Sequence, residues 1–331
     1  MNPAGEPGRT PVPAPVAEWS VMIPTYRPDE ALKEALLSAQ AALERAGAAA
    51  QIEVVDDASP GIDVAELLRG WGIDGVSVHR RAANGGLGEC WNTCIERSTA
   101  PLVHILHQDD AVHPDFYSRM TAASRDYPTA LMFFCRTRIL DHSGSWLAPL
   151  HQEQDGLLPD WLTSICTKQT VYCPAVVVRR ATYASVGVFD PRLRYIIDWE
   201  MWIRIAAAGP VAYLADPLAS YRVHDGSESG RLLAGGQISS DFVIGIERIR
   251  RTLLAAGRRD CLKLAVNYAC EVSGAVTWGH EAAGRSHVAA KELLVAFRHF
   301  WWGMTPLLFL KHLKRYVKLR LQARREMRSA A

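Results

Sequence analysis

Hydrophobic and polar positions along the first part of the chain predict strands separated by helices. A short apolar strand over 20–23 ends at Pro24, and leucines recur at helical spacing from residue 30 until Gly47. Further strands are expected in three segments, with helices between them: QIEVVDDAS, VSVHRR and APLVHILHQDD. Alternating strands and helices predict an α/β fold with a mainly parallel sheet that helices cover on both faces.

After Pro128 the pattern changes. Two more strands (ALMFFCRTRILD and CPAVVVRRATY), a helix (DWEMWIRIAAAG) and a late strand (VAYLADPLASYRVH) are expected, and from about residue 230 the chain is mainly helical. The organisation expected is a flexible Pro-rich leader over 1–17, one domain over 18–230 whose halves meet near residue 128, and a helical extension over 231–331 with a basic amphipathic tail.

Composition narrows the class of protein. Of 331 residues, 49% are hydrophobic and 22% charged, which is typical of a folded soluble chain, and the net charge of +2 argues against a general nucleic-acid binder. Seven cysteines without regular close spacing indicate reduced thiols. The N-terminus lacks the apolar core of a signal peptide, and no apolar run approaches the roughly 20 residues that a membrane span needs. A cytoplasmic protein is therefore expected.

Several polar residues lie just beyond predicted strand ends: Tyr26, Asp57, Asn84 and Asp110. In sheets of this kind ligands bind at the carboxyl ends of the strands, so these side chains are expected to converge on one rim. Asp110 also follows Asp109 directly, and two adjacent carboxylates at a strand end favour a bound cation. The alternative is a simple turn in which Asp109 caps the following segment.

Seven segments, in this order, resemble the family 2 glycosyltransferases of the GT-A fold: SVMIPTYRP, IEVVDDAS, RRAANGGLGECWN, ILHQDDAVHPDF, VVVRRATYASVGVFD, IIDWEMWIR and YRVHDGSES. The resemblance covers roughly residues 18–230. It implies a GT-A type nucleotide-diphospho-sugar transferase fold, in which 18–127 binds the nucleotide sugar and 128–230 forms the acceptor half.

The resemblance implies a metal site at the two acids. Asp110 is expected to coordinate Mn²⁺ or Mg²⁺, since hard oxygen ligands suit these ions, and the ion would neutralise the charge of a leaving diphosphate. Asp109 is expected to contact the ribose or the water shell of the metal. His224, in the late segment YRVHDGS, is expected to bind the metal or a phosphate.

A donor site is implied around the same rim. Asp57 would accept a hydrogen bond from the base, although Asp56 or Asp57 could instead cap the next helix with help from Ser59. Tyr26 would stack on the base, or else pack against the first helix. The donor-binding residues expected are Pro24, Thr25, Tyr26, Asp57, Arg81, Asn84, Gly85, Gly86, Asp109 and Arg222.

Asp198 is expected to be the catalytic base. It would take the proton from the acceptor hydroxyl as that oxygen attacks the anomeric carbon, with inversion at that carbon. The family usually has Glu before this Asp, whereas this chain has Ile197. An N-cap role for Asp198 is the alternative. Trp199 or Trp202 would line the acceptor site, and core packing of Trp202 is equally compatible with the sequence.

The tail over 297–331 combines aromatic residues with a run of Lys and Arg. Trp301 and Trp302 beside a basic amphipathic helix are typical of a segment that binds an anionic membrane surface, although packing on the catalytic domain or a dimer contact would explain it too. Membrane binding would place the protein peripherally on the cytoplasmic face and would suit a lipid-linked saccharide acceptor.

The sequence thus predicts a metal-dependent, inverting glycosyltransferase. It would move a sugar from a UDP- or dTDP-sugar to an acceptor hydroxyl, in the synthesis of a cell-surface polysaccharide or a glycolipid. The alternative is a non-catalytic protein of the same fold that binds sugar nucleotides or serves as a scaffold. A nicotinamide-dependent oxidoreductase is disfavoured, because the Gly-x-Gly-x-x-Gly spacing is absent.

Overall fold

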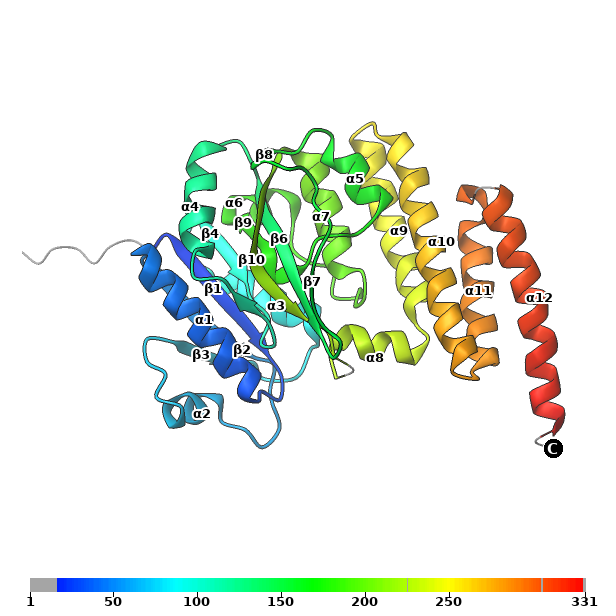
Figure 1. Cartoon of the computed structure of the whole chain (residues 1–331), viewed down its shortest axis with the longest axis horizontal. Helices are drawn as coiled ribbons and strands as arrows, with labels where there is room; N and C mark the ends of the chain where they lie inside the picture. Colours follow the sequence, from blue (N-terminus) through cyan, green and yellow to red (C-terminus); the bar gives the residue numbers. More distant parts are fainter. Residues whose placement is uncertain (1–16, 225, 305, 330–331) are drawn as a thin grey trace, which may run out of the picture.

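The computed structural model describes residues 17–224, 226–304 and 306–329, so that nearly all of the expected leader lies outside it. Ten strands form one central sheet (Figure 1). They are β1 (Trp19–Thr25), β2 (Ala50–Asp56), β3 (Ser77–Arg80), β4 (Leu102–Ile105), β5 (Ala111–Val112), β6 (Met132–Asp141), β7 (Gly144–Leu147), β8 (Gly156–Leu157), β9 (Val176–Arg179) and β10 (Val211–Arg222).

Helices flank the sheet and continue beyond it to the end of the described chain (Figure 1). Those around the sheet are α1 (Glu30–Ala46), α2 (Val64–Gly70), α3 (Leu87–Arg97), α4 (Phe116–Asp126), α5 (Trp161–Thr167), the 3₁₀ turn η1 (Cys173–Ala175), α6 (Arg180–Val186) and α7 (Ile197–Ala208). Those that follow are α8 (Glu228–Gly235), α9 (Ile238–Ala255), α10 (Arg259–Ala282), α11 (Ser286–Phe300), the 3₁₀ turn η2 (Trp301–Gly303) and α12 (Pro306–Ser329).

The first helix illustrates how local sequence sets an element. Asp29 accepts a hydrogen bond from the backbone N–H of Ala31 and caps the N-terminus of α1, while Gly47 ends the helix in a left-handed conformation with φ of 58°. Leu32 and Leu36 are buried against the sheet as the leucine spacing predicts. Leu37 is 48% exposed, however, because it lies outside the apolar stripe.

The sheet is mixed rather than mainly parallel, which corrects the expectation for its second half. The strand order is β3-β2-β1-β4-β9-β6-β10-β5, and β1 pairs in parallel with both β2 and β4. β9 runs antiparallel to β4 and β6.

Strand register brings the carboxyl ends of three strands to one line. Thr25 of β1 pairs with Asp56 of β2, and Asp56 pairs with Arg80 of β3. The backbone N–H of Asp57 then donates to the carbonyl of Thr25, and that of Arg81 to the carbonyl of Asp56. The residues that directly follow the strands therefore lie side by side at one rim.

The helices after residue 230 pack on the α/β part and share a hydrophobic core with it. Phe242 of α9 and Ala265 of α10 are fully buried in the same cluster as Trp199 of α7. Arg248 of α9 forms ion pairs with Glu200 of α7 and with Asp190. Figure 1 shows α9 and α10 against the sheet domain, with α11 and α12 beyond them. In the described part of the chain, no helix combines the length and the apolar character needed to cross a bilayer.

Candidate active site

Asp110 lies in the turn between β4 and β5. Its side chain is 3% exposed, and its Oδ1 accepts a hydrogen bond of 2.9 Å from the backbone N–H of Arg222, the last residue of β10. The contact forms because β5 pairs with β10 directly after Asp110. Among the described residues, no hydrogen-bond donor reaches Oδ2, which is also buried. Burial, with a smaller contribution from the charge of Asp109, raises the pKa of Asp110 to about 6.

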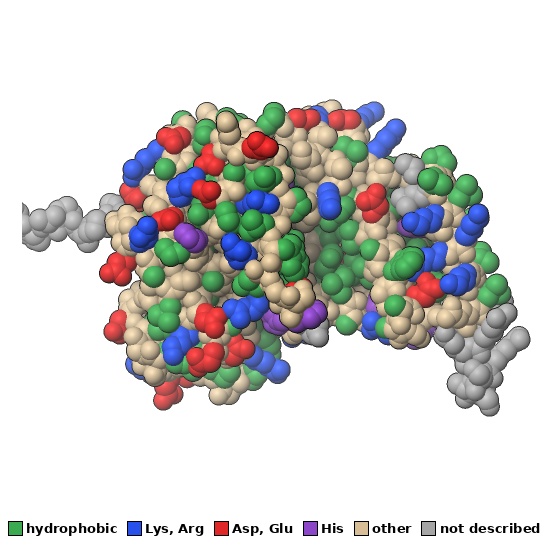
Figure 2. Space-filling model, viewed as in Figure 1, with side chains coloured by type: hydrophobic (Ala, Val, Ile, Leu, Met, Phe, Trp, Pro, Cys, Tyr) green, Lys and Arg blue, Asp and Glu red, His purple; other side chains and the backbone are tan. Residues whose placement is uncertain are grey.

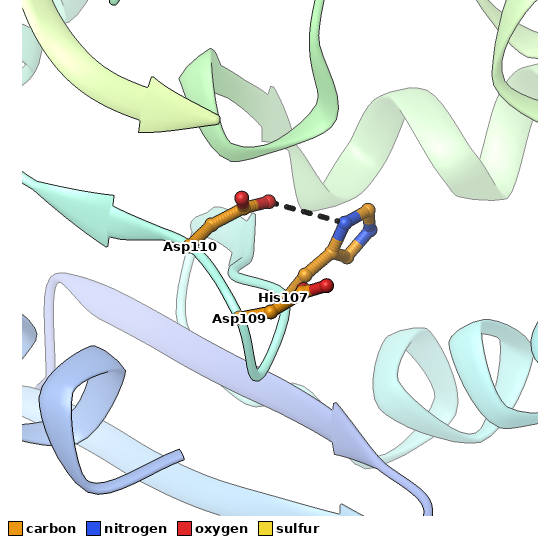
Figure 3. Close-up of side chains that lie close together, drawn as sticks. All are labelled: His107, Asp109 and Asp110. Carbon is orange, nitrogen blue, oxygen red and sulfur yellow. Dashed lines mark ion pairs between the residues drawn. The ribbon is translucent and has the colours of Figure 1, made fainter. Parts of the chain in front are cut away.

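His107 completes a cluster with the two acids. Its Nδ1 lies 3.4 Å from Oδ2 of Asp110, and ligand atoms of His107, Asp109 and Asp110 all lie within 4.8 Å of one another. Figure 3 shows the imidazole and the Asp110 carboxylate directed toward each other. Burial lowers the pKa of His107, but interactions with Asp110 and Cys173 outweigh it and leave that pKa well above its ordinary value.

This cluster fits a divalent cation. Two carboxylates provide the hard oxygen atoms that Mg²⁺ and Mn²⁺ prefer, and Oδ2 of Asp110 is a buried acceptor that Nδ1 of His107 approaches to 3.4 Å without a well-aligned hydrogen bond. The sequence motif identified both acids. It did not identify His107, because a histidine is an optional ligand for these ions.

His224 and Arg222 reach the acids from the late strand. Nε2 of His224 lies 2.9 Å from Oδ2 of Asp109, and Nε of Arg222 donates to the backbone carbonyl of Asp109 over 3.1 Å. The Arg222 guanidinium also forms an ion pair of 2.6 Å with Glu34 of α1. Two residues far from the acids in sequence thus lie beside Asp109.

A second cluster of predicted residues surrounds Asp57. Its carboxylate accepts hydrogen bonds from the guanidinium of Arg81 and from the backbone N–H groups of Gly85 (3.1 Å) and Gly86 (2.9 Å). The side-chain amide of Asn84 donates to the backbone carbonyl of Asp57 over 3.2 Å. A carboxylate accepts about four hydrogen bonds, so Asp57 keeps capacity for a donor on a bound base.

Neighbouring Asp56 has a structural role. Its carboxylate accepts hydrogen bonds from the backbone N–H and the hydroxyl of Ser59 and forms an ion pair with Arg80. These contacts hold the turn after β2, in which Ala58 has a positive φ of 57°. Neither aspartate caps α2, because Asp63 does so by accepting from Glu66. The capping alternative is therefore wrong in detail.

The turn after β1 is held by Gln108. Its Oε1 accepts hydrogen bonds from the Thr25 hydroxyl and, over 3.1 Å, from the backbone N–H of Tyr26. Pro24 and Thr25 are the last residues of β1, and the partly exposed Tyr26 ring has the Arg27 guanidinium 5.3 Å from its centroid. Gln108 stands at the first position of the expected acidic motif, and it connects the turn after β1 to the turn that carries the acids.

Asp198 is the second residue of α7. Its Oδ1 accepts from the backbone N–H of Trp199 over 2.6 Å, and its Oδ2 accepts from the side-chain amide of Gln169 over 3.0 Å. The carboxylate is partly exposed. Burial raises its pKa to about 6, against smaller lowering effects of these two donors and of His107. The residue before the helix, Ile196, occupies the N-cap position, so Asp198 is not the cap.

The structure does not agree with an acceptor-binding role for Trp199 or Trp202. Their exposed fractions are 1% and 2%, and both belong to the hydrophobic core. The indole N–H of Trp199 donates to the carbonyl of Ile165, and the Trp202 ring packs edge-on against Phe189. Core packing, the alternative given for Trp202, therefore applies to both indoles, because α7 is buried in the core that it shares with α9.

Residues 20–185, half of the chain, match the model of a family described as glycosyl transferase family 2. The chain belongs to glycosyl transferase family 2. The match includes both acids and the Asp57 cluster and stops before Asp198.

Relatives of this family member are distant in sequence. A Sinorhizobium fredii protein, y4gI, is 24% identical over 214 residues, which are 63% of this chain and 23% of that protein. A Rickettsia typhi protein named as an uncharacterized glycosyltransferase, RT0329, is 23% identical over 222 residues, which are 65% of this chain and 66% of that protein. The chain therefore spans less than two thirds of the length of either relative.

Solved structures share the fold over nearly the whole length. S. aureus TarS 1-349 in complex with UDP-GlcNAc has a TM-score of 0.68 at 15% identity, covering 93% of this chain and 92% of that chain. The same protein in complex with UDP has a TM-score of 0.64 at 15% identity over the same shares. The likeness shows the GT-A-like fold. Because the match covers 93% of this chain, it includes helices after residue 230.

Proposed function

We propose that the protein transfers a sugar from a nucleotide-diphosphate donor to an acceptor hydroxyl. The observation that carries the proposal is the buried Asp110 carboxylate, clustered with Asp109 and His107, at the rim where the Asp57 cluster also lies. A sugar nucleotide carries a base, a diphosphate and a reactive carbon in sequence. The rim offers an acceptor for the base, a cation site for the diphosphate and a carboxylate at Asp198 for the reaction.

The donor is proposed to be a UDP- or dTDP-sugar. Uracil and thymine both carry an N–H that can donate a hydrogen bond to the Asp57 carboxylate, and Tyr26 can stack on the base. Arg81, Asn84, Gly85 and Gly86 hold Asp57 in place, and Pro24 and Thr25 set the turn that carries Tyr26. Arg222, beside the acids, is proposed to approach the diphosphate.

Mn²⁺ or Mg²⁺ is proposed as the cofactor, held by Asp110 and His224. His107 belongs to the same cluster, and Asp109 would contact the ribose or the water shell of the ion. When bound, the ion supplies neutralisation of the negative charge that develops on the leaving diphosphate. The chain itself supplies the fixed direction of Asp110, through the backbone N–H of Arg222.

Asp198 is proposed as the general base. Its carboxylate takes the proton of the acceptor hydroxyl while that oxygen bonds to the anomeric carbon and the bond from this carbon to the diphosphate breaks. A single displacement of this kind inverts the anomeric carbon. The pKa of about 6 keeps the carboxylate deprotonated at neutral pH and makes it a better proton acceptor than an ordinary aspartate.

The C-terminal helices are proposed to bind the cytoplasmic face of a membrane. In α12, Leu307 is 79% and Leu310 53% exposed, and the neighbouring Trp301 of η2 is 61% exposed. Lys311 and Lys314 lie on the exposed surface of the same helix. Such a surface suits the headgroup region of an anionic bilayer, and the acceptor would then be a lipid-linked saccharide in polysaccharide or glycolipid synthesis.

A panel of nucleotide sugars, with and without Mn²⁺, tests the proposal. We expect UDP- or dTDP-sugars to raise the melting temperature of the protein only when Mn²⁺ is present, and to be hydrolysed slowly in the absence of an acceptor. Stabilisation without any turnover would favour the non-catalytic binding protein. No stabilisation by any nucleotide sugar would contradict both functions.

A further inference from the structure

Tyrosines from four separate elements surround the Asp198 region. Tyr172 precedes η1, Tyr195 precedes α7, Tyr221 is in β10 and Tyr268 is in α10. The ring centroids of Tyr172 and Tyr221 lie 5.0 Å apart, and that of Tyr268 lies 5.1 Å from Trp199. All four rings are neither fully buried nor fully exposed. Tyr195 and Tyr268 also pack against the hydrophobic core, and each of the four rings keeps part of its surface accessible.

Contacts link these tyrosines to Asp198 and to the acids. Tyr195 lies three residues before Asp198, and Tyr172 lies three residues after Gln169, whose side-chain amide donates to Asp198 over 3.0 Å. The Tyr268 ring packs against Trp199, the residue that follows Asp198. Tyr221, whose ring contacts Tyr172, directly precedes Arg222, and the backbone N–H of Arg222 donates to Asp110, so the cluster extends from the acids to Asp198. After the larger effect of burial, the charge of Asp198 also raises the pKa of Tyr195, Tyr221 and Tyr268.

Two of the hydroxyls are available to a ligand. Across residues 17–224, 226–304 and 306–329, no hydrogen bond engages the hydroxyl of Tyr172 or of Tyr195. The Asp198 carboxylate accepts a hydrogen bond from the side-chain amide of Gln169, which lies three residues before Tyr172 in the same loop. Figure 2 shows this face hollowed between the sheet domain and α9, over α7, with hydrophobic side chains in the hollow.

We infer that the tyrosines Tyr172, Tyr195, Tyr221 and Tyr268 form the subsite for an acceptor saccharide, and that the C-terminal helices complete it through Tyr268. The inference rests on the proposed function. The apolar C–H face of a pyranose packs well on an aromatic ring, while phenol hydroxyls bond to sugar hydroxyls. The subsite is assigned to the acceptor rather than the donor sugar because Asp198, the proposed base, lies within it.

Saturation-transfer NMR with methyl β-glucoside, methyl β-galactoside and methyl N-acetyl-β-glucosaminide tests the subsite in the full chain. We expect at least one glycoside to bind the wild-type protein through its pyranose protons. Tyr172→Ala removes a ring and should weaken that binding about tenfold. Tyr268→Phe removes only a hydroxyl and should cause a smaller loss. Tyr316→Phe, in α12, is the matched control and should bind as the wild type does.

Two results would overturn the inference: no glycoside binds the wild-type protein, or Tyr172→Ala, with an unchanged melting temperature, binds as strongly as the wild type. Stabilisation by UDP with Mn²⁺ is measured separately on the same proteins and should be equal in all of them. A protein that binds glycosides through Tyr172 but gains no stability from UDP with Mn²⁺ contradicts the proposed transferase function and supports the saccharide site.

Discussion

The Asp198 carboxylate is directed by two hydrogen bonds, from the Trp199 backbone and from Gln169. Asp198→Asn keeps the shape of the side chain but removes the basic oxygen. We expect the kcat of sugar transfer to fall by about 10²–10⁴-fold, with unchanged stabilisation by the nucleotide sugar. Steady-state kinetics and thermal shift measure the two quantities. Asp141→Asn, in an exposed turn, is the control, and wild-type turnover in Asp198→Asn would identify another base.

The pH dependence of the rate follows from the same residue. The pKa of Asp198, about 6, lies above its ordinary value, so the base is protonated and inactive below pH 6 and kcat should fall about tenfold per pH unit there. Gln169→Leu removes a hydrogen bond that lowers this pKa. We therefore expect the acid limb of kcat to move to higher pH in the variant, measured with saturating donor and Mn²⁺. An unmoved limb would mean that Asp198 does not control it.

At the scale of an element, the start of α3 depends on the absence of a side chain at Gly85. A Cβ there would lie 2.6 Å from Nη1 of Arg81 and 2.9 Å from Cβ of Glu89. Gly85→Ala should push Arg81 away from Asp57 and weaken UDP binding about tenfold, the value of one charge-assisted hydrogen bond. Isothermal titration measures the affinity. Gly70→Ala, with nothing within 4 Å, should bind UDP normally, and equal affinities in both variants would contradict the role of this turn.

The loop ahead of α7 is held by a helix of the C-terminal extension. Asp241 of α9 accepts hydrogen bonds of 3.0 Å from the backbone N–H groups of Arg194, Tyr195 and Ile196. Asp241→Asn retains one acceptor oxygen and leaves backbone donors unpaired in a buried site. We expect it to lower the free energy of unfolding by about 1–3 kcal/mol, measured by urea denaturation. An unchanged denaturation midpoint would show that the loop does not depend on α9.

At the scale of the whole molecule, the exposed apolar and basic residues of η2 and α12 lie at the end farthest from the first strands. Figure 2 shows hydrophobic and basic side chains together on this right-hand end. A net charge of +2 for the whole chain conceals this concentration of Lys and Arg in the tail. If this end binds a bilayer, the position of the tail relative to the sheet fixes how the α/β rim is oriented toward the membrane surface.

Co-sedimentation with anionic phosphatidylglycerol vesicles tests that surface. The double variant Leu307→Ser with Leu310→Ser should pellet less than the wild type, and added salt should release both, because each basic residue near the surface contributes about 1 kcal/mol. Leu37→Ser, a 48% exposed leucine of α1, is the control and should pellet as the wild type does. Equal pelleting of the double variant and the wild type would remove membrane binding through α12.

The sequence by itself determined the order of strands and helices up to β4 and the residues at those strand ends, but it missed α4 and assigned the first residues of α6 to a strand. Periodicity and caps act within a few residues, so Asp29, Gly47 and the acids after β4 could be recognised without knowledge of the fold. The family resemblance supplied the fold and named Asp57 and Arg81 as donor-binding residues, but it did not predict the ion pair that the two form.

Tertiary structure alone decided which side chains meet across distant elements. Gln108 met the turn after β1 because β1 pairs with β4, and Trp199 was withdrawn into the core because α9 packs on α7. Tyr268 reached the Asp198 region by the same packing. Such contacts depend on how whole faces of elements fit together, and no local pattern in the chain encodes them.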